Sequence, residues 1–355
     1  MEHLGLRRRL ALDIARKLRD QAVREHPLRL LFWECTLRCN LACRHCGSDC
    51  KATAGCKDMP IEDFARVLDS VAAATDPHKV MVNVTGGEPL VRPDLEQCGR
   101  VIYEKGFPWG MVTNGMLLTP ERYKSLLHSG LRALTISLDG IGEDHDWMRG
   151  RQGCYAKTVE AIRMVAASGE VEFDVVTCVN RRNFDHLAEI RDLLVGLGLK
   201  EWRLFTVFPV GRGAEDPELQ VSNAQFRALM EFIKATRREG RIKASYGCEG
   251  FLGPYEGDVR DHFYQCHAGV TVGGVLCDGS ISACTSIRSD YHQGNIYRDD
   301  FMEVWNTRFA PYRDRSWMKK DACGDCRFWK YCLGNGMHLR DADGHLLLCH
   351  LHRLD

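Results

Sequence analysis

The chain has 355 residues, and its 48 lysines and arginines balance 48 aspartates and glutamates, so the formal net charge is zero. A neutral chain gives no electrostatic support for nucleic acid as a partner, and no apolar run reaches the roughly 18 residues that predict a membrane-spanning helix. The chain contains 17 cysteines, which is a high count. Secreted disulfide scaffolds are usually small, so clustered cysteines in a chain of this length indicate metal sites, and we expect a cytoplasmic protein without a signal peptide.

Residues 1–29 predict a basic amphipathic helix. The apolar positions are Leu4, Leu10, Ile14 and Leu18, and the cationic positions are Arg7, Arg8, Arg9, Arg16, Lys17 and Arg19. A helix of this kind either packs on the rest of the chain or contacts a partner or a membrane surface. We favour packing, with membrane-surface contact as the alternative.

Residues 30–240 alternate between strand-like and helix-like segments. The strand-like segments are apolar and lie at residues 30–36, 79–85, 109–113, 133–138, 171–179 and 202–208. The helical patterns lie at residues 60–74, 93–105, 120–129, 155–168, 184–197 and 223–238. Apolar strands that alternate with helices predict an α/β fold with a parallel sheet. Six units, where a closed barrel has eight, predict a partial (β/α)6 barrel that is open on one side.

Three cysteines follow the first strand with the spacing CxxxCxxC, at Cys39, Cys43 and Cys46. Three thiolates can hold three irons of a [4Fe–4S] cube and leave the fourth iron free to bind a small molecule. This loop follows the carboxyl end of a strand, where α/β barrels place their active sites. A zinc site or a set of buried free cysteines is the alternative, although zinc sites more often pair CxxC with a second CxxC or HxxxH. Cys50 and Cys56 flank the loop and have no predicted role.

The second strand ends in Gly86-Gly87-Glu88-Pro89. Together with the CxxxCxxC loop, this motif resembles the radical S-adenosylmethionine (SAM) superfamily. The resemblance implies that the open iron chelates the methionyl amino and carboxylate groups of SAM. It also implies that reductive cleavage of SAM yields a 5′-deoxyadenosyl radical, which abstracts hydrogen from the substrate.

The same resemblance suggests which residues bind SAM. Gly86 and Gly87 would bring the backbone close to the methionyl ammonium, and Glu88 would help to fix that cation. Ser137, at the end of a strand, would contact the ribose or carboxylate, with a strand-end cap as its alternative role. Arg149 would bind the carboxylate through its guanidinium, with an ordinary surface charge as its alternative. Asn114 is a weaker candidate because Asn-Gly is a common turn.

Beyond residue 240 the helical periodicity fades and a second set of cysteines begins, so we predict a separate domain at 241–355. Cys266, Gly279 and Cys284 have the spacing C-x12-G-x4-C, and Cys323, Cys326 and Cys332 then follow as C-x2-C-x5-C. Cys349 completes the series. These spacings resemble the SPASM domain, the auxiliary-cluster module of radical SAM maturases.

The SPASM pattern implies two auxiliary [4Fe–4S] clusters, of which one is complete here. Cys323, Cys326, Cys332 and Cys349 would ligate the second auxiliary cluster, with a zinc ribbon as the alternative. The first auxiliary site would use Cys266, Cys284 and an upstream Cys248. The pattern has another cysteine three residues beyond Cys332, where this chain has Gly336. The first site is therefore either open, completed by His267 or His338, or absent, and the chain holds two or three clusters.

The resemblance as a whole implies an enzyme that cleaves SAM and modifies a peptide or protein. The expected partners are this substrate and a reductant such as flavodoxin or ferredoxin. The segment before the first strand is too short for the winged-helix leader-binding domain of many peptide maturases. Recognition would then use the barrel mouth, the N-terminal helix or a separate protein.

Two other functions are open. One is a radical SAM enzyme that acts on a small molecule in cofactor or natural-product biosynthesis. The other, from a different class, is a zinc-binding interaction protein. The catalytic base and the final hydrogen donor are unknown from the sequence, and Cys178 and Tyr264 are only nominal candidates.

Overall fold

The computed structural model describes residues 4–247, 249–287 and 291–355, and a ten-stranded sheet runs through this part of the chain. Seven consecutive strands lie side by side and in parallel, in the order of the chain. They are β1 (Leu30–Thr36), β2 (Met81–Gly86), β3 (Trp109–Thr113), β4 (Leu131–Ser137), β5 (Glu172–Val179), β6 (Glu201–Thr206) and β7 (Lys243–Tyr246). The predicted α/β fold with an open parallel barrel is confirmed.

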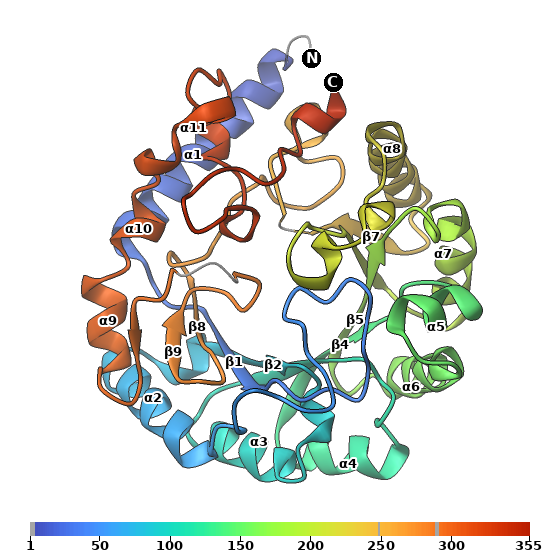
Figure 1. The fold of residues 1–355 in the computed structure, drawn as a ribbon, viewed down its shortest axis with the longest axis vertical. Helices are drawn as coiled ribbons and strands as arrows, with labels where there is room; N and C mark the ends of the chain where they lie inside the picture. The colour runs from blue at the N-terminus through green and yellow to red at the C-terminus, as the bar shows by residue number, and fades with distance from the viewer. Residues whose placement is uncertain (1–3, 248, 288–290) are drawn as a thin grey trace.

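The connecting helices cover the outer face of this sheet (Figure 1). They are α2 (Ile61–Ala74), α3 (Leu95–Glu104), α4 (Pro120–His128), α6 (Cys154–Ser168), α7 (Leu187–Gly196) and α8 (Asn223–Glu239). Local signals set several of their ends: Ser222 and Gln225 form a capping box before α8, and Gly240 ends it in the left-handed region with φ 70°. In the barrel, the short helix α5 (Glu143–Arg149) and strand β7 were not predicted.

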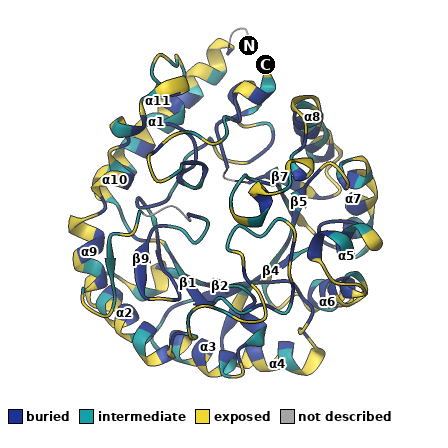
Figure 2. Ribbon diagram, viewed as in Figure 1, coloured by how far each residue is buried: buried dark blue, intermediate teal, exposed yellow. Residues whose placement is uncertain are grey.

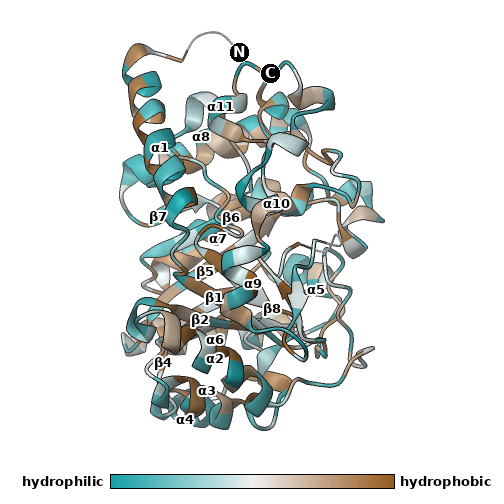
Figure 3. Cartoon of the chain, turned by 90° about the vertical axis from the view of Figure 1, so that its left-hand side faces the viewer, coloured by the Kyte–Doolittle hydropathy of each residue, from teal (hydrophilic) through white to brown (hydrophobic). Residues whose placement is uncertain are grey.

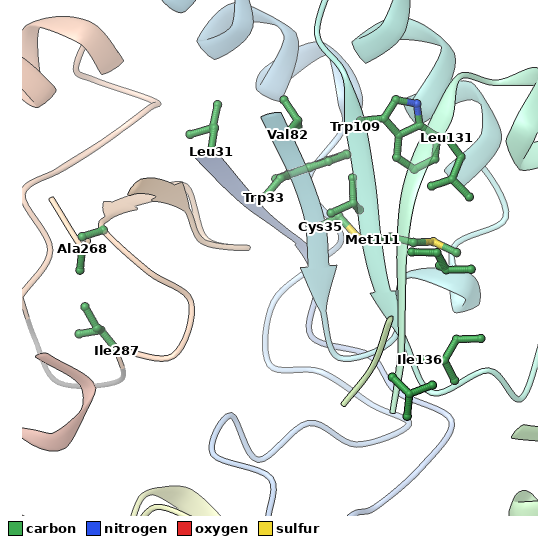
Figure 4. Close-up of a cluster of buried hydrophobic side chains, with 14 of the residues drawn as sticks. Leu31, Trp33, Cys35, Val82, Trp109, Met111, Leu131, Ile136, Ala268 and Ile287 are labelled. Atoms are coloured by element: carbon green, nitrogen blue, oxygen red, sulfur yellow. The ribbon is translucent and has the colours of Figure 1, made fainter. Parts of the chain in front are cut away.

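The hydrophobic core lies between the sheet and these helices (Figures 2 and 4). Trp33, Trp109 and Trp202 are completely buried, and the Trp33 ring stacks on Phe64 with 4.6 Å between centroids. The strands are mainly hydrophobic, whereas the helices also carry hydrophilic residues (Figure 3). Burial of this apolar surface holds the strands in register, and so fixes where their carboxyl ends meet.

The cysteine-rich region joins the same sheet at the edge formed by β1. Strand β8 (Val272–Val275) pairs in parallel with β1, and β9 (Ser280–Ser282) and β10 (Gly294–Asn295) follow in antiparallel order. Three short helices complete the region: α9 (Phe301–Thr307), α10 (Ala310–Arg313) and α11 (Trp329–Cys332). Strands β7 and β8 lie beyond residue 240 but belong to the same sheet as the barrel, so the sheet does not divide the chain there. The domain boundary at residue 240 therefore stays a prediction.

The N-terminal helix α1 (Leu6–Glu25) packs, but through a face that the sequence did not indicate. Leu12 is buried on that face, and the Arg19 guanidinium donates hydrogen bonds of 2.9 Å to the carbonyl oxygens of Lys330 and Tyr331. The helix therefore lies along α11 (Figure 1).

The predicted apolar row of α1 faces solvent, apart from Leu4, which is buried. Leu10, Ile14 and Leu18 are 57%, 61% and 63% exposed, and Leu6 is 74% exposed. The expectation that this row packs on the barrel is wrong. No helix within the described residues is long and apolar enough to cross a membrane.

Candidate active site

A cavity of about 150 Å³ lies at the carboxyl ends of β1 to β4. Every residue predicted to bind SAM or its cluster lines this cavity: Cys39, Cys43, Cys46, Gly86, Gly87, Glu88, Asn114, Ser137 and Arg149. The parallel register explains this meeting, because the carboxyl ends of parallel strands share one edge of the sheet. His45, which the sequence left open between a contact with the adenine of SAM and an ordinary loop position, also lines the cavity. Cys50 and Arg212 line it too and were not predicted to do so.

Arg212 fastens the cysteine loop from a distant part of the chain. Its Nε donates a 2.8 Å hydrogen bond to the Cys43 carbonyl oxygen, and its backbone N–H donates one of 3.1 Å to the Cys46 carbonyl oxygen. Its guanidinium also bonds the Cys50 carbonyl oxygen at 3.2 Å. Nothing in the local sequence marks Arg212, since it belongs to the segment after β6.

The three thiols of the cysteine loop differ in the direction in which their pKa values are shifted. Burial raises the pKa of Cys39 to about 12. Burial also raises the pKa of Cys43, with Arg149 opposing the shift. A hydrogen bond with the Cys50 thiol lowers the pKa of Cys46 to about 5. Because cluster ligation needs thiolates, loading iron here must release protons from Cys39 and Cys43.

The Gly86-Gly87 turn lies directly against the strand and loop that lead to Cys39. The Gly87 N–H donates a 2.8 Å hydrogen bond to the Thr36 carbonyl oxygen, and the Glu88 N–H donates one of 3.0 Å to that of Arg38. A Cβ atom on Gly86 would overlap the Thr36 carbonyl, and one on Gly87 would overlap the Arg38 carbonyl. Only glycine allows this close approach.

We expect Gly87→Ala to lower the free energy of unfolding by about 1–3 kcal/mol, because the new methyl group must push the loop away. Urea unfolding monitored by circular dichroism measures this cost. Gly55→Ala is the matched control, since a Cβ atom on Gly55 meets nothing within 4 Å. Equal unfolding curves for the two variants would show that the close approach does not constrain the turn.

Glu88 ties the turn to the end of β3. Its buried carboxylate accepts hydrogen bonds from the Thr113 hydroxyl at 2.6 Å, the Leu90 N–H at 3.1 Å and the Asn114 N–H at 2.7 Å. Burial raises the pKa of Glu88. The Asn114 side chain then reaches Asn40 in the cysteine loop, with 2.8 Å between Nδ2 and Oδ1. Both residues therefore position the backbone around the cavity.

Arg149, at the end of α5, forms a buried ion pair with Asp139, and its Nη2 lies 2.7 Å from the Asp139 Oδ2. Its Nη1 lies 3.7 Å from the Cys43 sulfur, and its buried Nε has no hydrogen-bond partner among the residues that the structure describes. Burial alone would raise the pKa of Asp139, but Arg149, together with His45, His145 and the Cys178 N–H, holds that pKa below its ordinary value. Arg149 is 8% exposed, so its alternative role as a surface charge is excluded.

The four thiols predicted for the second auxiliary cluster lie near one another. Burial raises the pKa of Cys332 to about 12, and the charges of Cys349, Cys323 and Cys326 add to this shift. Arg340 Nη2 lies 3.2 Å from the Cys323 sulfur, and the Asn335 N–H lies 3.2 Å from that of Cys332. Such hydrogen-bond donors stabilise thiolate ligands and adjust the reduction potential of a bound cluster.

For the first auxiliary site, the structure describes Cys266 and Cys284, and Cys248 lies outside the described residues. Burial would raise the pKa of Cys266, yet Arg315 and backbone N–H groups lower it below its ordinary value. The charges of both thiols act on the Tyr312 hydroxyl, so the two cysteines share one environment.

The two nominal candidates for proton or hydrogen transfer lie in different places. The Cys178 N–H donates a 2.8 Å hydrogen bond to Asp139, so this residue neighbours the buried ion pair. Tyr264 belongs to the hydrophobic cluster beneath α1, and it does not line the cavity at the strand ends.

A family model described as the radical SAM superfamily matches residues 33–194, and one described as an iron–sulfur cluster-binding domain, SPASM, matches residues 266–327. An AdoMet-dependent heme synthase of Methanosarcina barkeri is 29% identical over 328 residues, covering 86% of this chain and 90% of the relative. The mycofactocin maturase MftC of Mycobacterium ulcerans is 31% identical over 314 residues, covering 86% of this chain and 82% of the relative.

The fold also resembles that of a solved structure, Streptococcus suis SuiB bound to its precursor peptide SuiA. The TM-score is 0.70 at 17% sequence identity, and the match covers 90% of this chain and 74% of SuiB. At this identity the likeness concerns the fold alone.

Proposed function

Because this chain belongs to the radical SAM superfamily and carries a SPASM iron–sulfur domain, we propose that it is an enzyme that modifies a peptide or protein by hydrogen abstraction. Its cofactors are [4Fe–4S] clusters and SAM. The observation that carries the proposal is the single cavity at the strand ends, where three cysteines, the two glycines and a buried arginine meet.

The donor set in this cavity suits a cluster with one open iron. When bound and reduced, that cluster supplies the electron that splits SAM into methionine and a 5′-deoxyadenosyl radical. Cys39, Cys43 and Cys46 would each hold one iron. Arg149, whose Nε lacks a partner among the described residues, would direct that donor toward the SAM carboxylate.

The other predicted contacts with SAM are inferred from where each residue lies in the cavity. The backbone at Gly86 and Gly87 would receive the methionyl ammonium, since both residues line the cavity. Ser137, on the cavity wall at the end of β4, would contact the ribose or carboxylate. Glu88 and Asn114 would act by holding the surrounding backbone, because their side chains already bond the chain itself.

A peptide or protein substrate is supported by the likeness to MftC, which is named as a maturase. A flavodoxin or ferredoxin would supply electrons, and the cytoplasm would provide the reducing conditions that iron–sulfur thiolates need. The second candidate, action on a small molecule, is favoured by the heme synthase of Methanosarcina barkeri. A zinc-binding interaction protein does not fit the family to which the chain belongs.

The test starts from the chain purified without oxygen from its own cells, with any bound peptide identified by mass spectrometry. The enzyme is reconstituted with iron and sulfide, then given dithionite and SAM. We expect 5′-deoxyadenosine to form and the peptide to change in mass. An iron porphyrin is the control substrate. If the porphyrin alone stimulates 5′-deoxyadenosine formation and no peptide changes, the peptide proposal is wrong.

A further inference from the structure

The departure of this chain from the SPASM cysteine pattern lies at Gly336, and the structure places another side chain there. A Cβ atom on Gly336 would lie 2.6 Å from Cε1 and 2.8 Å from Nδ1 of His338. Real side chains do not approach so closely, so the imidazole occupies the volume that a cysteine at position 336 would fill. Gly336 directly precedes the 3-10 turn Met337–Leu339, which turns His338 back onto it.

The Nε2 atom of this imidazole, on the side away from Gly336, is available to bind a ligand. The His338 Nε2 is shielded from solvent and has no hydrogen-bond partner in the part of the chain that the structure describes. Buried polar atoms are nearly always paired, so an unpaired one indicates a missing group. The ring is held in place by Phe208, with 5.0 Å between ring centroids and an interplanar angle of 63°.

The backbone of Cys266, a cysteine of the first auxiliary site, lies beside the same turn. The Arg315 guanidinium donates hydrogen bonds of 3.3 Å to the Cys266 carbonyl oxygen and to the Asn335 carbonyl oxygen, and Asn335 directly precedes Gly336. The side chains of Cys266 and Cys284 both pack against the hydrophobic core that contains Tyr312. Arg315 therefore joins the turn that carries His338 to a cysteine that the SPASM pattern assigns to this site.

His267, the other histidine near this site, has a different environment. Its Nδ1 lies 3.1 Å from the Thr271 hydroxyl. Its ring lines a groove beside α1 together with Leu12 and Tyr331. His267 thus faces the N-terminal helix, and it provides a matched control for His338.

We propose that His338 Nε2 ligates an iron of the first auxiliary cluster, in place of the cysteine thiolate that the SPASM pattern has at position 336. The inference rests on the proposed function, since it requires an auxiliary cluster. Imidazole is a suitable ligand for iron. Where histidine replaces cysteine on an iron–sulfur centre, the reduction potential rises, because a neutral ligand stabilises the oxidised iron less than a thiolate does.

The experiment uses the full-length chain with Cys39, Cys43 and Cys46 replaced by alanine, so that only auxiliary clusters contribute. The reconstituted, reduced protein is examined by pulsed EPR for nitrogen coupling, by iron analysis and by redox titration. We expect about eight irons, four per cube, and a nitrogen coupling from one cluster. His338→Ala should lose this coupling and about four irons, whereas His267→Ala should keep both.

The variant Gly336→Cys/His338→Ala restores the family ligand and removes the clash with the imidazole, and the new Cβ atom then has the Glu249 carbonyl oxygen, at 2.9 Å, to displace. It should recover the lost iron, show no nitrogen coupling and have a lower reduction potential than the parent. Nitrogen coupling that persists in His338→Ala overturns the inference, and so does a parent that holds only one auxiliary cluster. A parent without any cluster overturns the proposed SPASM function itself, so the two failures are distinguishable.

Discussion

The variant in which Cys39, Cys43 and Cys46 are all replaced by alanine is expected to form no 5′-deoxyadenosine from SAM. These thiols line one cavity, and without them no open iron is available to hold the methionyl group. Iron should fall by about four per chain, because the other clusters have separate ligands. Anaerobic reconstitution, iron analysis and chromatographic detection of 5′-deoxyadenosine after addition of dithionite measure both effects.

Cys56→Ser is the matched control for this variant. Cys56 belongs to the same loop region but does not line the cavity, and its sulfur lies 2.9 Å from that of Cys277. It should retain the iron content and SAM cleavage of the parent. SAM cleavage at the parental rate in the triple variant would refute the assignment of the cavity.

Arg149→Ala is expected to reduce the free energy of unfolding by about 3–5 kcal/mol, because it leaves the Asp139 carboxylate buried without its partner. Asp139 is 1% exposed, so water cannot replace the guanidinium. Adding Asp139→Asn to Arg149→Ala should recover much of this loss, since it removes the unpaired charge. Urea unfolding gives all three values, and Arg163→Ala, on an exposed position of α6, should stay within about 0.5 kcal/mol of the parent.

The cost of Arg149→Ala should also depend on pH. In the parent, Arg149 is the strongest of the groups that offset burial and hold the pKa of Asp139 below its ordinary value, so the contribution of this carboxylate is fully present above the unfolded pKa of about 3.9. Without Arg149, burial raises that pKa, and the carboxyl group becomes easier to protonate as the pH falls. The destabilisation should therefore be largest near neutral pH and smaller near about pH 5. A cost that does not change with pH would show that Asp139 is not the source.

The local motifs were sufficient to predict the cysteine loop and the Gly-Gly turn as parts of one site. Each is a short segment at the carboxyl end of a strand, and parallel strands bring such ends to one edge whatever the details of packing. The strand and helix periods, set by burial of one face of each element, gave the same six units that the structure contains.

What the sequence could not provide depends on contacts between distant residues. Arg212 holds the cysteine loop although it lies 169 residues beyond Cys43 and carries no local signal. Asp139 and Arg149 are near neighbours in the chain, but only the fold of the segment between them brings their charges together. The pairing of β8 with β1, and the choice of which face of α1 is buried, follow from the surface that other elements leave available.

At Gly336, too, the sequence predicts one feature of the site and the tertiary structure supplies another. The comparison with the SPASM pattern predicts that a cysteine is absent at position 336, because that pattern is linear along the chain. Only the folded turn shows that the His338 ring lies in its place, since a side chain two residues away reaches that volume only when the backbone doubles back. Linear spacing therefore indicates which chemistry the chain carries, and packing decides which side chains lie beside those cysteines.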